Sequence, residues 1–353
     1  MEISILIFAS FILRVIISFH GTLMLDQNTF IAWSNILVQR GFSSFYSDWS
    51  DYLPGYLYVL WLLGKIKEFI PLPAVVLYKM PAIISDVLVG WLIYAIVRKI
   101  KNEKLALIAA SLYLFNPAIL ANSTLWGQVD SLTSLFSLLS VYLVGTSSIF
   151  SAVSLAIGIM IKPQAVFVIP VILFITIKDK WKFSKIFTYG LIFTLVFVLG
   201  FIPFLSRGDN IFSFIFERLM ATFSQYPYTS VNAFNFWGLA GFWKADKILF
   251  SVIGYIISLA VILFAAWKIW KEKRAKYYLV AVSFLVSFLF FTRMHERHLL
   301  PVFAPLLIAA SSSNFLLIPY FGLSITYLAN LYYSFNWISD NFREVFSSQA
   351  INF

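Results

Sequence analysis

Apolar stretches alternate with short polar segments along the whole chain, and these stretches predict helices that cross a membrane. A helix needs about 20 apolar residues to span the hydrocarbon core of a bilayer. Stretches near this length lie at 3–20, 80–97, 105–121, 131–145, 148–161, 165–177, 186–206, 248–267, 277–292, 299–313 and 315–333. The pattern predicts an all-α polytopic membrane protein with about 11 transmembrane helices, in a single domain over residues 1–353.

The composition supports this class of protein and excludes others. Of the 353 residues, 61% are hydrophobic and only 12% are charged, against about 25% charged residues in soluble domains. The chain has no cysteine, which rules out disulfides and thiol-ligated metals. A net charge of +10 could also indicate a nucleic-acid-binding protein, but the cationic loops of a polytopic protein usually set its orientation in the membrane. We therefore expect no nucleic-acid partner.

The distribution of basic residues predicts that orientation. Half of the 26 Lys and Arg residues fall in three short segments, at 98–104, 178–185 and 268–276. The positive-inside rule places all three on the cytoplasmic side. Counting crossings from them puts the N-terminus in the cytoplasm and the loops 21–79 and 207–247 outside. We expect a multi-pass protein of the plasma membrane with its active site on the extracytoplasmic face.

The first external loop, 21–79, is long, amphipathic and acidic. Apolar residues recur at helical spacing in Asn28–Arg40, which predicts a helix lying in the membrane interface. Asp26 would lie just before its first turn, where the helix dipole favours a carboxylate. Gly41 would end this helix, and Pro54 would start a second one, Gly55–Phe69.

Three aspartates of this loop, Asp26, Asp48 and Asp51, stand among aromatic residues that include Tyr52. Aromatic rings stack on the apolar faces of sugars, but they also form belts at membrane interfaces. The aspartates could equally act as a helix cap and as turn residues. Their number in one loop beside lipid favours a loop that holds a catalytic base, with Asp48, Asp51 and Tyr52 shaping a sugar or acceptor pocket.

Other polar residues converge on the same predicted side. Trp126, Gln128 and Asp130 lie at the outer end between two predicted spans, where a proline and a glycine permit a broken helix around a cavity. Lys162 is a lone cation in the tight turn that follows. Its side chain could snorkel toward water or bind a phosphate.

The segment TRMHERHLLP, at 292–301, forms the last polar cluster. Arg293 and Arg297 would share a helix face at i,i+4, as would His295 and His298 at i,i+3, with Glu296 between them. Because arginine binds phosphate in a bidentate manner, the cluster predicts a phosphate site, with an interfacial belt of cations as the alternative. A metal site is not favoured, because the HxxH pair lacks a third histidine nearby in the sequence, and we expect no cofactor.

Two charges, Arg14 and Asp86, fall inside predicted spans and are therefore functional candidates by default. Each lies six residues from the outer end of its span, so both should sit at about the same depth, roughly 9 Å in. Equal depth favours a structural ion pair over a catalytic one.

External carboxylates opposite external cations suit one reaction class. A carboxylate deprotonates an acceptor hydroxyl, the hydroxyl attacks a sugar carbon, and cations stabilise a departing lipid phosphate. A lipid-linked donor would explain why the enzyme is embedded in the membrane. A carrier or flippase of lipid-linked sugars and a structural partner subunit are the alternatives; transporters often show two related halves with a site at the midplane, which this chain lacks.

The chain also resembles a known superfamily, the GT-C glycosyltransferases, and within it the prokaryotic mannosyltransferases related to the second mannosyltransferase of GPI-anchor synthesis. The resemblance lies in the loop around Asp26 and in DYLPGYLYVLWLLG (51–64), YKMPAIISD (78–86), FNPAILANSTLWGQVDS (115–131), IKPQ (161–164), NAFNFWG (232–238) and RMHERHLLP (293–301). It implies a GT-C-like bundle whose large first external loop carries interfacial helices. It further implies a polyprenyl (dolichyl) phosphate sugar donor, commonly of mannose, inverting transfer to a glycan, glycolipid or protein acceptor, and Asp26 as the base.

The chain departs from the superfamily pattern at three positions. Many members carry a second acidic residue next to the base, where this chain has Gln27, and this weakens any metal requirement. Leu53 stands where related sequences are expected to have proline, and His298 where they have tyrosine. His298 could add a phosphate contact or one that depends on pH.

Overall fold

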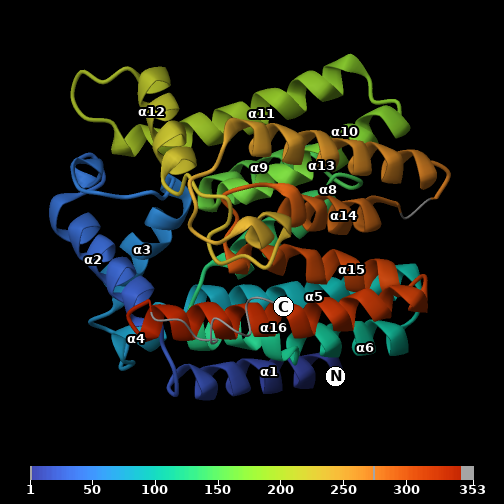
Figure 1. Ribbon diagram of the computed structural model, residues 1–353, viewed down its shortest axis with the longest axis horizontal. Coiled ribbons are helices and arrows are strands. Elements are labelled where there is room, and N and C mark those ends of the chain that lie inside the picture. The colour runs from blue at the N-terminus through green and yellow to red at the C-terminus, as the bar shows by residue number, and fades with distance from the viewer. Residues whose placement is uncertain (1, 273–274, 343–353) are drawn as a thin grey trace.

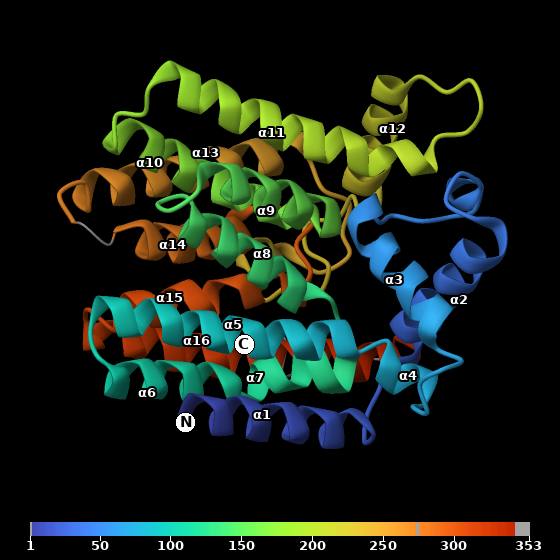
Figure 2. The ribbon, with the colours of Figure 1, turned by 180° about the vertical axis from the view of Figure 1, so that it is seen from behind.

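The computed structural model describes residues 2–272 and 275–342, and helices account for most of them. Eleven helices run roughly side by side in Figures 1 and 2: α1 (Glu2–Ser18), α5 (Met80–Ile100), α6 (Glu103–Leu114), α8 (Asp130–Leu143), α9 (Ser148–Ile161), α10 (Ile169–Lys178), α11 (Phe183–Phe201), α13 (Ile248–Lys268), α14 (Ala275–Phe290), α15 (Phe303–Ala310) and α16 (Leu317–Ser339). The described residues contain isolated β-bridges but no strand.

Every predicted membrane-crossing range holds one of these helices, so the all-α prediction is confirmed. Among the described residues, four helical segments are long and apolar enough to cross a membrane by themselves: 74–100, 183–204, 248–268 and 314–339. A fifth is the pair 103–114 and 117–126, bent by 46° at the break near Pro117 that the sequence suggested. The membrane class therefore stands, whereas the count of about 11 crossings stays a prediction.

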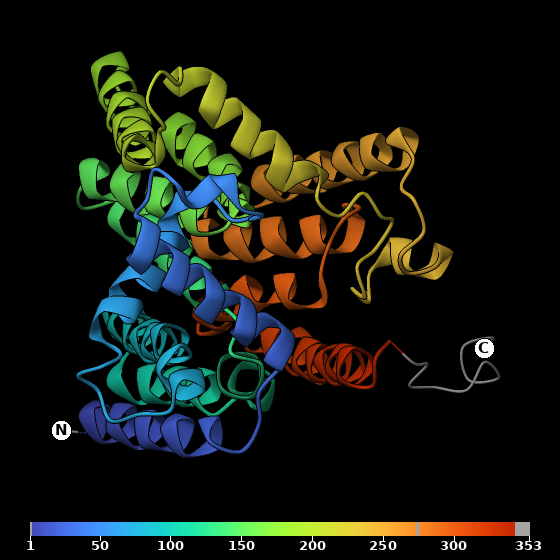
Figure 3. The ribbon, with the colours of Figure 1, turned by 90° about the vertical axis from the view of Figure 1, so that its left-hand side faces the viewer.

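The remaining helices gather at one end of the bundle, which we call the loop end. They are α2 (Met24–Arg40), α3 (Pro54–Ile66), α4 (Ala74–Leu77) and α12 (Ile211–Ser224), and Figure 3 shows α2 lying across this end. The turns α5–α6, α10–α11 and α13–α14 lie at the opposite end (Figures 1 and 2). These turns carry the three basic segments, except for residues 273 and 274, which lie outside the described residues. The even number of helices predicted between the segments accounts for their position at one end.

Short elements lie between and beside these helices. They are the 3₁₀ helices η1 (Phe45–Ser47), η3 (Pro163–Val168), η4 (Ile202–Phe204), η5 (Phe236–Ala240), η6 (Glu296–Val302) and η7 (Asn314–Leu316), the helix α7 (Pro117–Leu120) and the π-helix η2 (Ala121–Trp126). The second loop, 207–247, contains the helix α12 and the 3₁₀ helix η5, neither of which the sequence reading predicted.

Two helix limits in the first loop test the sequence reading. The helix predicted at Asn28–Arg40 begins earlier, at Met24, so the predicted start was wrong. A carboxylate is favoured both before and within the first turn of a helix, so Asp26 did not distinguish the two starts. The predicted end of α2 holds, since Gly41 follows it with φ +79°, and Pro54 opens α3 as predicted. The predicted end of the second helix at Phe69 was wrong, because α3 ends at Ile66.

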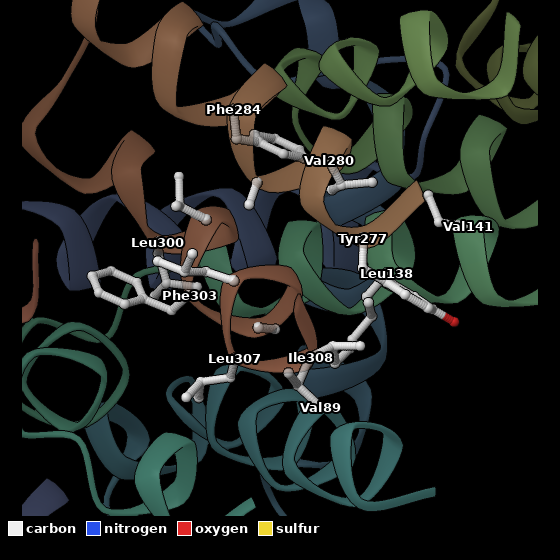
Figure 4. Close-up of a cluster of buried hydrophobic side chains, with 14 of the residues drawn as sticks. Val89, Leu138, Val141, Tyr277, Val280, Phe284, Leu300, Phe303, Leu307 and Ile308 are labelled. Atoms are coloured by element: carbon white, nitrogen blue, oxygen red, sulfur yellow. The ribbon is translucent and has the colours of Figure 1, made fainter. Parts of the chain in front are cut away.

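The core lies between α5, α8, α14 and α15, where aliphatic and aromatic side chains interdigitate (Figure 4). Val89, Leu138, Val280 and Leu307 are among its fully buried members, and in a membrane-embedded bundle such side chains stabilise the fold mainly through van der Waals packing. At the edge of this core, Arg14 and Asp86 form the predicted ion pair, with Nε and Oδ2 3.4 Å apart and both side chains fully buried.

Candidate active site

Asp26 is held in the first turn of α2 by the turn that follows η2. The indole Nε1 of Trp126 donates to its Oδ2 at 2.7 Å, and the Gln128 amide donates to the same oxygen. Next to it, the Gln27 amide donates to the carbonyl oxygen of Gly127 at 2.8 Å. Three consecutive residues, Trp126 to Gln128, therefore fix two consecutive residues of α2, and no hydrogen bond among the described residues uses the other carboxylate oxygen of Asp26.

The backbone of Gly127 makes this close approach feasible. Its φ is +82°, and a Cβ there would lie 2.9 Å from Cγ of Lys79 and closer still to the Gln27 amide. Lys79 is fully buried, and its ammonium donates to the Ser18 carbonyl at 3.0 Å and to the Thr22 hydroxyl at 2.8 Å. It joins the two ends of the first loop, a role that its sequence position did not reveal.

A second layer of the site consists of buried ion pairs. Lys162 Nζ lies 2.8 Å from Oδ1 of Asp130, and Nε of Arg297 lies 4.0 Å from its Oδ2. Arg297 also binds Glu296, with Nη1 and Oε1 2.7 Å apart. Burial lowers the pKa of Lys162, although the negative charge of Asp130 opposes this shift. Burial raises the pKa of Glu296, although the positive charge of Arg297 opposes it. The structure thus brings together four residues that the sequence analysis selected in three separate segments.

A polar cavity of about 100 Å³ opens beside this layer. Its charged, imidazole and phenol side chains are Asp51, Tyr52, Lys162, Tyr226, Arg293, His295, Arg297 and His298. Within the described residues no side chain pairs with the carboxylate of Asp51, and burial raises its pKa. Asp26 is not among the lining residues, although it interacts electrostatically with Asp51, Lys162 and Arg297.

An apolar groove of about 530 Å³ adjoins the polar cavity. Side chains of α12, η3 and α13 line it, Phe167, Phe216, Leu219, Met220 and Tyr255 among them. Six residues line both spaces: Pro163, Gln164, Thr222, Phe223, Arg293 and His298. The polar cavity and the apolar groove therefore share part of their walls.

The two arginines of the last cluster do not share a helix face, so that prediction was wrong. Arg293 has φ +65° and precedes η6, because the backbone around His295 forms bridges with the second loop instead of a helix. Its guanidinium binds Asp246 through Nε at 2.7 Å and Nη2 at 3.3 Å, and Nη1 donates to the Phe223 carbonyl at 2.9 Å. Its donors are thus largely engaged with the second loop.

The histidine pair does come together, on η6 and just before it. The rings of His295 and His298 lie 5.1 Å apart, and both are buried. Asp48, in contrast, binds Arg40 at 2.8 Å in a pair whose side chains are 40% and 57% exposed, and it does not line the cavity. Within residues 2–272 and 275–342, no three His, Asp or Glu side chains are grouped so that they could hold a metal ion.

The sequence reading missed several residues at the site. Gln164 and Thr222 line both spaces, Tyr226 lines the cavity, and Asp246 binds Arg293. Gln164 stands in the IKPQ segment, where only the lysine was selected. Tyr226 and Asp246 lie in the loop 207–247, which was predicted to be external although neither residue was singled out.

The apolar helical bundle and the polar site define a membrane glycosyltransferase once they are compared with known families. The model of glycosyltransferase family 87 matches residues 52–292, about two thirds of the chain, and the protein belongs to this family. The match ends before Arg293 and begins after Asp26, so these two parts of the site lie outside it. No curated protein sequence is significantly similar to the chain. The predicted glycosyltransferase class is confirmed, and the closer relationship to GPI mannosyltransferases stays a prediction.

Proposed function

We propose that the protein transfers one sugar, mannose, from a polyprenyl (dolichyl) phosphate donor to a lipid-linked glycan or protein acceptor, with inversion at the anomeric carbon. The reaction would take place at the extracytoplasmic face of the plasma membrane, with the N-terminus in the cytoplasm. No resident metal or other cofactor is part of the proposal.

The observation that carries this proposal is the continuity between the polar cavity and the apolar groove. A polyprenyl phosphate has an anionic head and a long apolar chain, and the walls of the two spaces match these two parts. Lys162, His295 and Arg297 suit the phosphate, because hydrogen bonds in which the donor or the acceptor is ionised are among the strongest in proteins. The groove between α12 and η3 suits the first isoprene units of the chain.

The chemistry follows from the placement of Asp26. Its carboxylate accepts the proton of an acceptor hydroxyl while the hydroxyl oxygen bonds to the anomeric carbon of the sugar. The bond between that carbon and the phosphate oxygen breaks, and the electron pair leaves with the polyprenyl phosphate. Lys162 and Arg297 stabilise the leaving phosphate, and the two donors to Oδ2 of Asp26 orient its other oxygen toward the acceptor.

The test measures sugar transfer by purified protein in liposomes that contain dolichyl phosphate mannose with a labelled mannose. Asp26→Asn should abolish transfer and leave the thermal unfolding midpoint unchanged. Asp48→Asn, the same substitution in the same loop but in an exposed ion pair, should keep wild-type turnover. Wild-type turnover by the Asp26→Asn variant would remove Asp26 from the role of base. Movement of intact donor across the membrane without consumption would favour a flippase instead.

A further inference from the structure

His295 and His298 cap the N-terminus of η6 reciprocally. His295 is the N-cap residue and His298 is the third residue of the helix. The backbone N–H of His295 donates to Nδ1 of His298 at 3.2 Å, and the side chain of His295 accepts from the backbone N–H at the third position. Serine or threonine with glutamate or glutamine usually makes such a capping box. In this chain two imidazoles make it.

The capping box fixes the protonation of both rings. A ring nitrogen that accepts a hydrogen bond carries no proton, so the proton of a neutral imidazole must be on the other nitrogen. Each histidine is therefore held as a neutral ring whose outer nitrogen is an N–H donor. A proton added to the inner nitrogen would break a capping bond, so charging either ring would also weaken the start of η6.

The surroundings of the pair also oppose a positive charge. His295 and His298 are 8% and 7% exposed, and burial together with Lys162 and Arg297 lowers the pKa of both well below its ordinary value. Lys162 stands at the end of α9 and Arg297 is on η6. The other titratable groups around the cavity are Asp51 and Tyr52 of the first loop, Tyr226 and the paired Arg293.

The two outer nitrogens have different partners. The outer nitrogen of His298, Nε2, lies 3.0 Å from Nε2 of the Gln164 amide. Turning this amide by 180° exchanges its nitrogen and oxygen, and the oxygen then accepts the N–H of His298. The turn is needed because Nδ1 of His298 already accepts from His295, and a neutral imidazole has only one nitrogen that can accept. No hydrogen bond among the described residues uses the outer nitrogen of His295, whose ring lines the cavity and stands edge-on to Tyr226 at 4.6 Å.

We propose that His295 binds a substrate oxygen as an uncharged N–H donor, and that His298 is a positioning residue that fixes the ring of His295 through the capping box. This inference rests on the proposed function, in which the oxygen belongs to the donor phosphate. The HxxH pair is then a helix cap with a ligand-binding side, and its contribution to affinity does not depend on pH between about 5.5 and 7.5.

Two substitutions separate the capping from the binding. His295→Asn keeps a good N-cap residue but removes the outer N–H, and it should weaken binding of polyprenyl phosphate mannose by about tenfold to a hundredfold. His298→Gln keeps a side chain that can complete the box, so it should lose less affinity than His298→Ala. The matched control is His20→Asn, an exposed histidine outside the cavity, which should leave the Kd unchanged. The unfolding midpoint of each variant checks its folding.

The charge of His295 is tested by measuring Kd for wild type and His295→Asn at pH 5.5 and pH 7.5. The donor is suitable because a phosphodiester does not titrate in this range, whereas a phosphomonoester does near pH 6. The ratio of the two Kd values should be the same at both pH values, because titration of Asp51 or Glu296 affects both proteins alike. A ratio that grows about tenfold at the lower pH, or a variant that binds as tightly as wild type, overturns the proposal. Donor binding with the predicted pattern but without transfer would overturn the proposed function alone.

Discussion

The buried ion pair between Asp130 and Lys162 allows a prediction in which stability and ligand binding change in opposite directions. Asp130→Asn keeps the size of the side chain and one hydrogen-bond acceptor for Lys162, but it removes the negative charge. Lys162 and Arg297 then remain as buried cations; Arg297 keeps its ion pair with Glu296, and Lys162 keeps only the weaker attraction of Asp26. We expect the variant to be less stable than wild type and to bind an anionic donor more tightly.

The magnitude follows from the geometry of the pair. At 2.8 Å and an effective dielectric constant of about 20, the attraction is about 6 kcal/mol before desolvation is subtracted. The side chains are 8% and 3% exposed, and removing one partner of such a buried pair typically costs about 3–5 kcal/mol. The exposed pair Arg40–Asp48 provides the comparison, because breaking it should cost at most about 1 kcal/mol.

Equilibrium unfolding in micelles, with and without dolichyl phosphate mannose, measures both effects. Tenfold tighter donor binding corresponds to about 1.4 kcal/mol of additional stabilisation at saturating donor. The reasoning is refuted if Asp130→Asn loses no more stability than Asp48→Asn. It is also refuted if the donor stabilises the variant and the wild type equally, because Asp130 then does not compete with the phosphate for the cations.

Two further predictions concern the turn that holds Asp26 and the free carboxylate of the cavity. Gly127→Ala should lower both the unfolding midpoint and the rate of transfer, because a Cβ has no room there. The control Gly190→Ala, on a helix with open space around that position, should instead stabilise the fold by about 0.5–1 kcal/mol. Equal unfolding midpoints for the two variants would contradict the prediction. Burial raises the pKa of Asp51 in the folded state, so the stability linked to its proton is present at low pH and is lost as pH rises through that pKa. Asp51→Asn should therefore raise the unfolding midpoint at pH 7.5 and lose this advantage near pH 4; a gap independent of pH would show that Asp51 does not titrate this way.

The helices could be predicted from the sequence because their signal is local. An apolar run that is long enough for a helix and bounded by charge marks α5 or α13 without knowledge of any contact. The limits were less certain, as α2 shows, because Leu23 precedes it without a side-chain cap and Asp26 suits either start. Arg293 was placed wrongly for a related reason: His295 forms bridges with the second loop, and this pairing overrides the helical spacing of the segment.

Partners within the site could not be predicted, because they are far apart in the sequence. Lys162, Asp130 and Arg297 were expected on the same side of the molecule, and the structure brings them together. Their pairing depends on how α8, α9 and η6 pack, which the sequence does not show. Asp246 is 47 residues from Arg293 and stands in a segment without a periodic pattern. The capping box of His295 and His298 has a local spacing, yet the same spacing fits a helix face, and only the backbone conformation distinguishes the two.

The apolar groove has a consequence for how donor affinity should be measured. A chain that moves from lipid into the groove leaves one apolar surrounding for another, so it gains little from the hydrophobic effect. A short water-soluble analogue, in contrast, gains about 0.8 kcal/mol for each methylene group that it buries. Affinity that rises steeply with chain length in solution would therefore reflect the cost of hydrating the analogue. In a bilayer, selection between lipids would depend on the fit of the chain to the groove wall and on the phosphate.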